Sequence, residues 1–199
     1  MARVASRRYF ECGGCDLAFM AGEDLPSPAQ ERAIYEQHQN DPSDPGYRAF
    51  LNRLVEPLAE RLSPGMRGLD FGAGPGPALA LMLGERGFPT LSWDPMFEPH
   101  EALLDSRYDF VTCSETVEHF HRPGIEFERL AALLRPGGWL AIMTQWRLPG
   151  AAFDRWGYVR DPTHACFFSE RTFGWLAVRH GLRLETPARH IALLQRGDA

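Results

Sequence analysis

The apolar positions of the chain change their period near residue 66. Before it, one stretch repeats apolar residues about every 3.6 positions, as one face of a helix does, at Phe50, Leu51, Leu54, Val55, Leu58 and Leu62. A second helical stretch precedes it at 28–40, and Asp, Pro and Gly separate the two at 41–46. From residue 66 onward, short apolar runs alternate with amphipathic stretches, which predicts strands alternating with helices.

Six apolar runs are strand candidates, at 67–72, 89–94, 108–114, 139–146, 182–187 and 190–196. Helices are predicted between them, at 77–85, 98–105, 124–135 and 169–181. Alternation of this kind indicates an α/β fold with a mostly parallel sheet and helices on both faces. The last two strands are close enough in sequence to pair antiparallel.

The turn after the first strand, in "LDFGAGPGPALALML", contains Gly72, Gly74 and Gly76 at alternate positions. Glycine there permits unusual backbone dihedrals and the close approach of a ligand, and in open α/β sheets ligands lie beyond the carboxyl ends of strands. A tight connection without a ligand is the alternative. We expect a ligand, because three glycines are more than a plain turn needs.

Two ligand classes fit such a turn. The dinucleotide fingerprint is G-x-G-x-x-G, with a pyrophosphate held by backbone amides at the helix start. Here the third glycine comes one residue early, and Pro75 and Pro77 have no N–H to donate to phosphates. Asp70 before the loop favours a nearby cation. Asp94 ends the second strand, where an acidic group accepts ribose hydroxyls; its alternative role is to begin a turn before Pro95.

Four stretches in this order carry a resemblance: "LDFGAGPG", "LSWDP", "YDFVTCSETVEHF" and "LLRPGGWLAIMT". Together they resemble the class I S-adenosylmethionine-dependent methyltransferases over residues 66–196. The resemblance implies a Rossmann-like seven-stranded sheet whose last strand is antiparallel, and S-adenosyl-L-methionine as cofactor. The implied cofactor-binding residues are Asp70, Gly72, Ala73, Gly74 and Gly76 around the methionine part, Asp94 at the ribose, Pro95 and Met96 beside the adenine, and Cys113, Ser114 and Glu115 near the methyl-bearing sulfur.

One part of the chain departs from the family's pattern. Only 14 residues separate Asp94 from Asp109, where the family has a further strand and a polar residue for the adenine amino group. That strand is therefore shortened or missing, and Asp105 is the candidate for the adenine contact.

Two histidines are candidate catalytic residues. His119 follows the third strand in "SETVEHFHRP", and His164 lies in the segment 147–168, which is too long for an ordinary connection. Either imidazole titrates near neutral pH and could act as a general base, with Asp161 to orient His164. The alternatives are a structural role in the cofactor loop for Glu118-His119, a metal site there, and a packed lid for 147–168. We expect no metal, and a substrate-facing role for 147–168, whose aromatic residues suit a small organic acceptor.

The N-terminal stretch "YFECGGCDLAFM" contains Cys12 and Cys15 as a lone C-x-x-C. It resembles one half of a zinc ribbon, but a structural zinc needs four ligands, so we expect no zinc here. The expected organisation is a partial zinc-ribbon-like segment at 1–24, a helical segment at 25–65 and the methyltransferase domain at 66–199.

Composition and charge limit the partners. The net charge of −5 and the lack of a basic patch beyond Arg3, Arg7 and Arg8 make nucleic acid an unlikely partner. No apolar run is long enough to span a bilayer, and the N-terminus has no secretory signal, so we expect a cytoplasmic protein without membrane partners. The helical segment is a candidate lid or homodimer contact.

The sequence therefore predicts methyl transfer from S-adenosylmethionine to a small-molecule acceptor, at oxygen, nitrogen or carbon. An NAD(P)-dependent oxidoreductase is an alternative, against which Pro75 and Pro77 speak. A non-catalytic cofactor-binding module on the same fold is another, against which the intact glycines and Asp94 speak.

Overall fold

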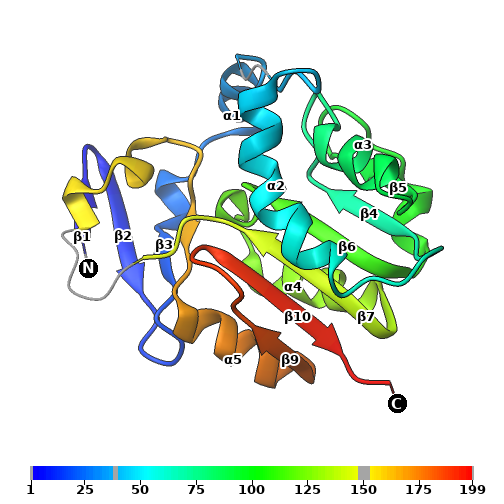
Figure 1. Cartoon of the computed structure of the whole chain (residues 1–199). Helices are drawn as coiled ribbons and strands as arrows, with labels where there is room; N and C mark the ends of the chain where they lie inside the picture. The colour runs from blue at the N-terminus through cyan, green and yellow to red at the C-terminus, as the bar shows by residue number, and fades with distance from the viewer. Residues whose placement is uncertain (1, 38–39, 148–152, 199) are drawn as a thin grey trace.

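A computed structural model describes residues 2–37, 40–147 and 153–198, which form two sheets with flanking helices (Figure 1). The larger sheet has six strands in the order β5-β4-β6-β7-β10-β9. In chain order these are β4 (Gly68–Phe71), β5 (Thr90–Trp93), β6 (Tyr108–Ser114), β7 (Leu134–Met143), β9 (Leu182–Glu185) and β10 (Ile191–Arg196). β4 to β7 are mutually parallel, whereas β10 runs antiparallel to both β7 and β9. The mostly parallel sheet and the antiparallel pairing of the last two strands are thus confirmed.

The expected seventh strand does not form among the described residues, so the predicted strand count is wrong. After β5 the chain turns back through a single bridge between Asp94 and Glu98 and then forms a 3-10 helix, Glu101–Asp105. The 14 residues between Trp93 and Tyr108 would have to contain a crossover out to that strand, the strand itself and a crossover back to β6, whereas one parallel crossover alone takes a dozen or more residues. β5 is therefore the edge of the sheet.

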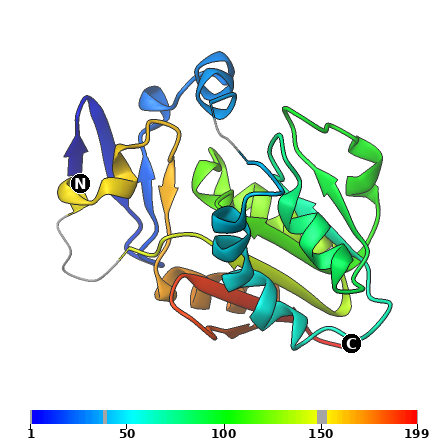
Figure 2. The same ribbon diagram turned by 45° about the horizontal axis from the view of Figure 1, so that its top comes forward.

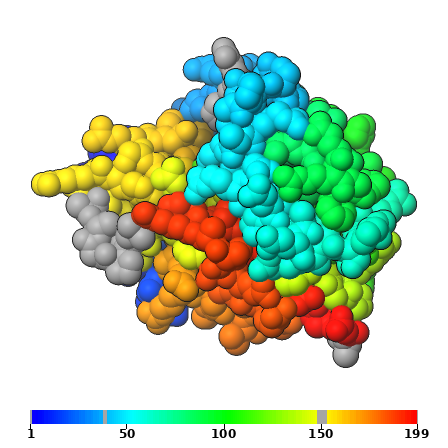
Figure 3. Space-filling model, viewed as in Figure 1, coloured from blue at the N-terminus to red at the C-terminus, as the bar shows by residue number. Residues whose placement is uncertain are grey.

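Helices cover both faces of the larger sheet, as predicted. α2 (Pro45–Ala59) and α3 (Ala78–Glu85) pack on one face, and α4 (Pro123–Ala132) and α5 (Glu170–His180) belong to the core on the other. The alternation of side chains along β7 divides the two cores: Leu140 and Ile142 face α4 and α5, whereas Ala141 and Met143 face α2 and α3. Figure 3 shows α2 lying across the front of the molecule beside α3.

The smaller sheet combines the N-terminus with a distant strand, in the order β1-β2-β3-β8. Its strands are β1 (Ala2–Val4), β2 (Arg7–Glu11), β3 (Ala18–Met20) and β8 (Cys166–Phe167). Tyr9 packs here against Phe153 and Phe167, in a third core that Trp156 joins. Phe167 of the 147–168 segment is therefore buried, and Phe153 and Trp156 are partly buried, in a core shared with the N-terminal strands.

The two cysteines of the C-x-x-C motif lie in the turn between β2 and β3. This turn docks on the start of α5, where the Thr172 hydroxyl donates to the Cys15 carbonyl at 2.9 Å. Cys15 is buried and Cys12 is partly exposed. The likeness of this segment to half of a zinc ribbon stays a prediction.

The first predicted helix is shorter than expected. α1 spans Pro28–Tyr35 and begins with a capping box made by Ser27 and Gln30, and residues 38 and 39 of the predicted helix lie outside the described residues. The view in Figure 2 shows α1 above the end of the sheet where β4 and β6 terminate. No helix among the described residues is both long enough and apolar enough to cross a membrane.

Candidate functional site

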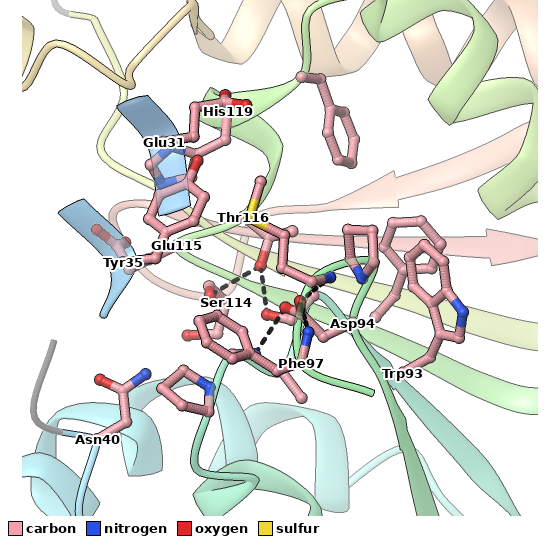
Figure 4. A pocket seen from close by; sticks show the side chains of 18 of the residues that line it. Glu31, Tyr35, Asn40, Trp93, Asp94, Phe97, Ser114, Glu115, Thr116 and His119 are labelled. Atoms are coloured by element: carbon pink, nitrogen blue, oxygen red, sulfur yellow. Dashed lines mark hydrogen bonds between the residues drawn. The ribbon is translucent and has the colours of Figure 1, made fainter. Parts of the chain in front are cut away.

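A cavity of about 610 Å³ lies at the carboxyl ends of β4, β5 and β6. The glycine turn after β4, the loop after β5, the loop after β6 and α1 form its walls (Figure 4). Of the predicted cofactor-binding residues, those that line it are Gly72, Ala73, Gly74, Asp94, Pro95, Met96, Ser114 and Glu115. Asp70, Gly76 and Cys113 lie behind this wall.

The glycine turn needs its first glycine for two reasons. Gly72 has a φ of +79°, in the region that side chains disfavour. A Cβ at this position would also overlap the Thr116 side chain from the loop after β6. Gly76 is needed for a different reason: the backbone lies so close to the connection between α1 and α2 that a Cβ would collide with the Asn40 carbonyl. The turn therefore packs against two other walls of the cavity.

The backbone donors of this turn are already used. Gly72 and Ala73 donate to the Trp93 carbonyl at 2.8 and 3.2 Å, and the Gly74 N–H donates to Asp94 Oδ2 at 2.9 Å. Pro75 and Pro77 have no N–H, so within residues 72–77 only the N–H of residue 76 has no bond among the described residues. Because a pyrophosphate needs several amide donors, this turn is poorly suited to a dinucleotide.

Asp94 organises the loop after β5. Its Oδ1 accepts from the N–H groups of Met96 at 2.8 Å and Phe97 at 3.1 Å, and its Oδ2 accepts from Gly74. The carboxylate thus has the turn-forming role that the sequence offered as the alternative. Each carboxylate oxygen accepts two bonds, so Oδ2 keeps one acceptor position for a ligand hydroxyl.

Asp70 is the penultimate residue of β4 and is buried, with its Oδ1 accepting from the Thr112 hydroxyl of β6 at 2.7 Å. Burial raises the pKa of this carboxyl to about 7, while the bond from Thr112 lowers it and the nearby Asp94 raises it. Asp70 therefore gains or loses its proton near neutral pH, and it carries a negative charge behind the glycine turn only when the proton is lost.

This shift predicts how stability depends on pH. Below about pH 4, Asp70 is protonated in both the folded and the unfolded states. Between pH 4 and 7 only the folded state keeps the proton, so the free energy of unfolding falls as pH rises. Above pH 7 both states have lost the proton, and the free energy of unfolding falls no further on account of Asp70. We expect Asp70→Asn to be more stable than the wild type by an amount that grows from pH 4 to pH 7.5, up to about 2–4 kcal/mol. Urea unfolding at several pH values measures it.

The control for this prediction is Asp105→Asn, which changes an exposed carboxyl before the start of β6, at the opposite end of the parallel strands. Its stability difference from the wild type should not depend on pH in that window. A stability difference for Asp70→Asn that stayed flat from pH 4 to 7.5 would show that Asp70 is ionised in the folded protein throughout.

The loop after β6 carries an acidic cluster. Glu115 has a φ of +48° and Glu118 is fully buried, and an oxygen of each lies within hydrogen-bond distance of the Tyr158 hydroxyl, which also bonds to Thr144. Burial raises the pKa of Glu115 to about 7 and that of Glu118 to about 8, and the charge of Glu115 adds to the shift of Glu118. Burial and these two carboxyl groups also raise the pKa of Tyr158. The phenol keeps its one proton and can donate to only one of these two carboxyl groups at a time, although both share its low-dielectric site.

The structure brings the two candidate catalytic histidines together. The rings of His119 and His164 are 4.8 Å apart between centroids, and both side chains line the cavity. His119 Nδ1 lies 3.2 Å from the Thr163 carbonyl, and His164 Nδ1 lies 2.7 Å from the Tyr158 carbonyl. Carbonyl oxygens only accept, so each Nδ1 carries the proton and each Nε2 carries the lone pair in the neutral ring. Asp161 Oδ2 is 3.9 Å from His164 Nε2, beyond hydrogen-bond distance, so an orienting role of Asp161 stays a prediction.

The sequence did not single out the residues that α1 contributes. Tyr35 packs edge-on against His119, and the buried Glu31 lies 2.9 Å from His121 Nε2. Arg32 donates to the Met96 carbonyl at 3.1 Å. These contacts hold α1 over the cavity (Figure 4), whereas the sequence indicated this segment only as a candidate lid or homodimer contact.

Comparison with known proteins agrees with this architecture. A family profile described as a methyltransferase domain matches residues 5–186. The ubiquinone biosynthesis O-methyltransferase of Proteus mirabilis (strain HI4320) is 35% identical over 91 residues, which are 46% of this chain and 37% of that protein. The match thus spans less than half the length of this curated relative.

Two solved structures share the fold at low sequence identity. The 1,6-didemethyltoxoflavin-N1-methyltransferase of Burkholderia thailandensis, with bound 1,6-didemethyltoxoflavin and S-adenosylhomocysteine, is 18% identical; the alignment covers 96% of this chain and 99% of that one, with a TM-score of 0.61. The magnesium protoporphyrin IX methyltransferase of Synechocystis PCC 6803, with bound S-adenosylhomocysteine, is 17% identical, covering 84% and 93%, with a TM-score of 0.54. With its family profile matched over residues 5–186, the chain belongs to the methyltransferase-domain family.

Proposed function

We propose that this protein transfers the methyl group of S-adenosylmethionine to an oxygen, nitrogen or carbon atom of a small-molecule acceptor inside the cavity. The reaction is a direct displacement, in which the acceptor atom forms a bond to the methyl carbon as the carbon–sulfur bond breaks. The electron pair of that bond stays on sulfur, so S-adenosylhomocysteine is the leaving group, and the acceptor atom loses its proton to a base or to water. The protein's task is then to hold the two molecules in line.

This proposal rests mainly on one observation, that the backbone N–H groups of the glycine turn are almost all hydrogen-bonded within the protein. The turn approaches the cavity closely but has almost no amide donors to spare. Such a turn suits a nucleoside without phosphates and disfavours the NAD(P) alternative. In the proposed pose the ribose lies at Asp94, the adenine lies beside Pro95 and Met96, and the methionine part lies along Gly72 and Gly74.

The acceptor in this pose lies beyond Ser114 and Glu115, toward the histidines. Asp161, His119 and His164 line that part of the cavity, with Tyr35 of α1 opposite the loop after β6. Of the segment 147–168, therefore, Asp161 and His164 face the proposed acceptor, whereas Phe153, Trp156 and Phe167 pack in the third core. The catalytic role of the two histidines, a homodimer through the helical segment and a cytoplasmic location stay predictions.

Turnover tests the proposal directly. The protein is incubated with S-adenosylmethionine and a panel of small phenols, carboxylates and nitrogen heterocycles, and S-adenosylhomocysteine and products heavier by one CH₂ unit are measured by mass spectrometry. We expect an acceptor-dependent increase of both, in equal amounts. If S-adenosylhomocysteine binds but no panel member or cell extract supports turnover, the non-catalytic module on this fold replaces the proposal.

A further inference from the structure

Three side chains beside the cavity form a constellation that methyl transfer alone does not require. Glu118, His119 and His164 each present one oxygen or nitrogen atom, and these three atoms lie within 4.8 Å of one another. They come from two segments of the chain 45 positions apart, joined by the bond from the Ala165 N–H to the Glu118 carbonyl at 2.7 Å. The group is therefore built by tertiary structure.

Both histidines are oriented as metal ligands are. A ligating imidazole typically donates its second N–H to a carbonyl or carboxylate, which fixes the ring and directs the other nitrogen to the ion. His119 and His164 meet this condition through the carbonyls of Thr163 and Tyr158, at 3.2 and 2.7 Å. In each ring the Nε2 atom carries the lone pair and faces away from the carbonyl that Nδ1 contacts.

Glu118 supplies a second and independent observation. Its side chain is fully buried, and although Oε1 accepts from Tyr158, Oε2 has no hydrogen-bond partner among the described residues. A buried carboxyl oxygen without a partner costs free energy, unless something not belonging to the protein satisfies it. A cation is the obvious group to do so, because the neighbouring Glu115 adds a second carboxyl to the same hydroxyl of Tyr158.

We propose that Glu118, His119 and His164 bind a divalent transition-metal ion such as Zn²⁺, Co²⁺ or Mn²⁺ at the acceptor end of the cavity. Two imidazoles and one carboxylate are the ligands these ions take when coordination positions are left open. Ligand atoms at about 2.1 Å from an ion lie about 3–3.5 Å apart, so the three side chains close by roughly an ångström on binding. Because both histidines line the cavity, the open positions face it, where water or an oxygen atom of a substrate completes the coordination.

This role takes up the metal-site alternative that the sequence offered for Glu118-His119, adds His164 to it, and departs from the expectation of no metal. The proposed metal site is also separate from the C-x-x-C motif, whose Cys12 and Cys15 thiols could bind Co²⁺ independently. The test therefore uses the Cys12→Ser/Cys15→Ser double variant of the full chain as its background, so that thiolate binding does not contribute.

Cobalt is the probe. The double variant is stripped with a chelator and titrated with Co²⁺, with visible absorption and the metal content after dialysis as readouts. We expect one Co²⁺ per chain. Glu118→Gln and His164→Asn, each added to this background, should weaken binding at least tenfold, whereas the matched control His180→Asn, at the far end of α5, should leave it unchanged.

The inference is overturned if the double variant binds no Co²⁺, or if it binds Co²⁺ as tightly with Glu118→Gln and His164→Asn as without them. Only variants that keep the wild-type circular dichroism spectrum count, and His119→Asn is the third choice if either of the others fails to fold. Binding of S-adenosylhomocysteine is measured on the same metal-free sample. If that binding persists while Co²⁺ binding is absent, the metal inference fails and the proposed function stands.

Discussion

Replacing Asp94 by alanine is expected to weaken S-adenosylhomocysteine binding by roughly 10- to 100-fold, about 1–3 kcal/mol, the cost of leaving polar partners unsatisfied. The effect has two physical sources. The variant removes the acceptor for the N–H groups of Gly74, Met96 and Phe97, which hold the glycine turn and the loop after β5 in place. It also removes the remaining acceptor position of Oδ2 that we assign to the ribose. Calorimetry with the cofactor product measures the loss.

Asp94→Asn separates the two sources. Its amide oxygen still accepts from Met96 and Phe97, but its NH₂ group faces the Gly74 N–H and cannot accept from it or from a ribose hydroxyl. We expect an intermediate loss of affinity and a smaller loss of stability than with alanine. An alanine variant that binds the product as tightly as the wild type would mean that the ribose is held elsewhere.

The second large effect is expected at Gly72. The Cβ of an alanine at this position would overlap the Thr116 side chain. The alanine would also have to adopt the φ of +79° that Gly72 has, which residues other than glycine rarely do. We expect binding of S-adenosylhomocysteine to fall by 100-fold or more. The melting temperature should fall by about 5–10 °C, as a loss of 2–3 kcal/mol implies for a chain of this size.

Two further variants test the cause. Gly84→Ala in α3 is the matched control, because a Cβ there meets nothing within 4 Å; it should keep full binding and equal or exceed the wild-type stability. Thr116→Ala added to Gly72→Ala removes the overlapping atoms and should restore part of the lost stability, while the backbone strain remains. If Gly72→Ala alone behaved like Gly84→Ala, the turn would not have the tight packing described above.

The sequence predicted the parts of the site that the sheet itself positions. Gly72 and Asp94 follow consecutive strands, and the carboxyl ends of parallel strands meet at one edge, so their proximity follows from the strand pattern alone. The 14 residues between Asp94 and Asp109 likewise predicted the loss of a strand, and the six-stranded sheet agrees. The seventh strand, by contrast, was inferred from the resemblance, and that count was wrong.

The contacts between loops could not be predicted in the same way. His119 and His164 meet because β8 joins the N-terminal strands, which draws the 153–168 segment back over the loop after β6. No spacing in the sequence encodes that pairing. The aromatic residues of this segment were equally hard to assign from the sequence. Phe153 and Trp156 could have packed on Tyr9 or lined a substrate pocket, and only the tertiary structure shows that they pack in the core of Tyr9.

The most direct measurement of the central claim compares two ligands on the wild-type protein by calorimetry. A glycine turn whose amides are already bonded should accept a sulfur nucleoside and reject a pyrophosphate. We expect S-adenosylhomocysteine to bind at micromolar concentration with one site per chain, and NAD⁺ and NADP⁺ to give no heat up to millimolar concentration. Micromolar binding of either nicotinamide dinucleotide, with no binding of S-adenosylhomocysteine, would contradict the account.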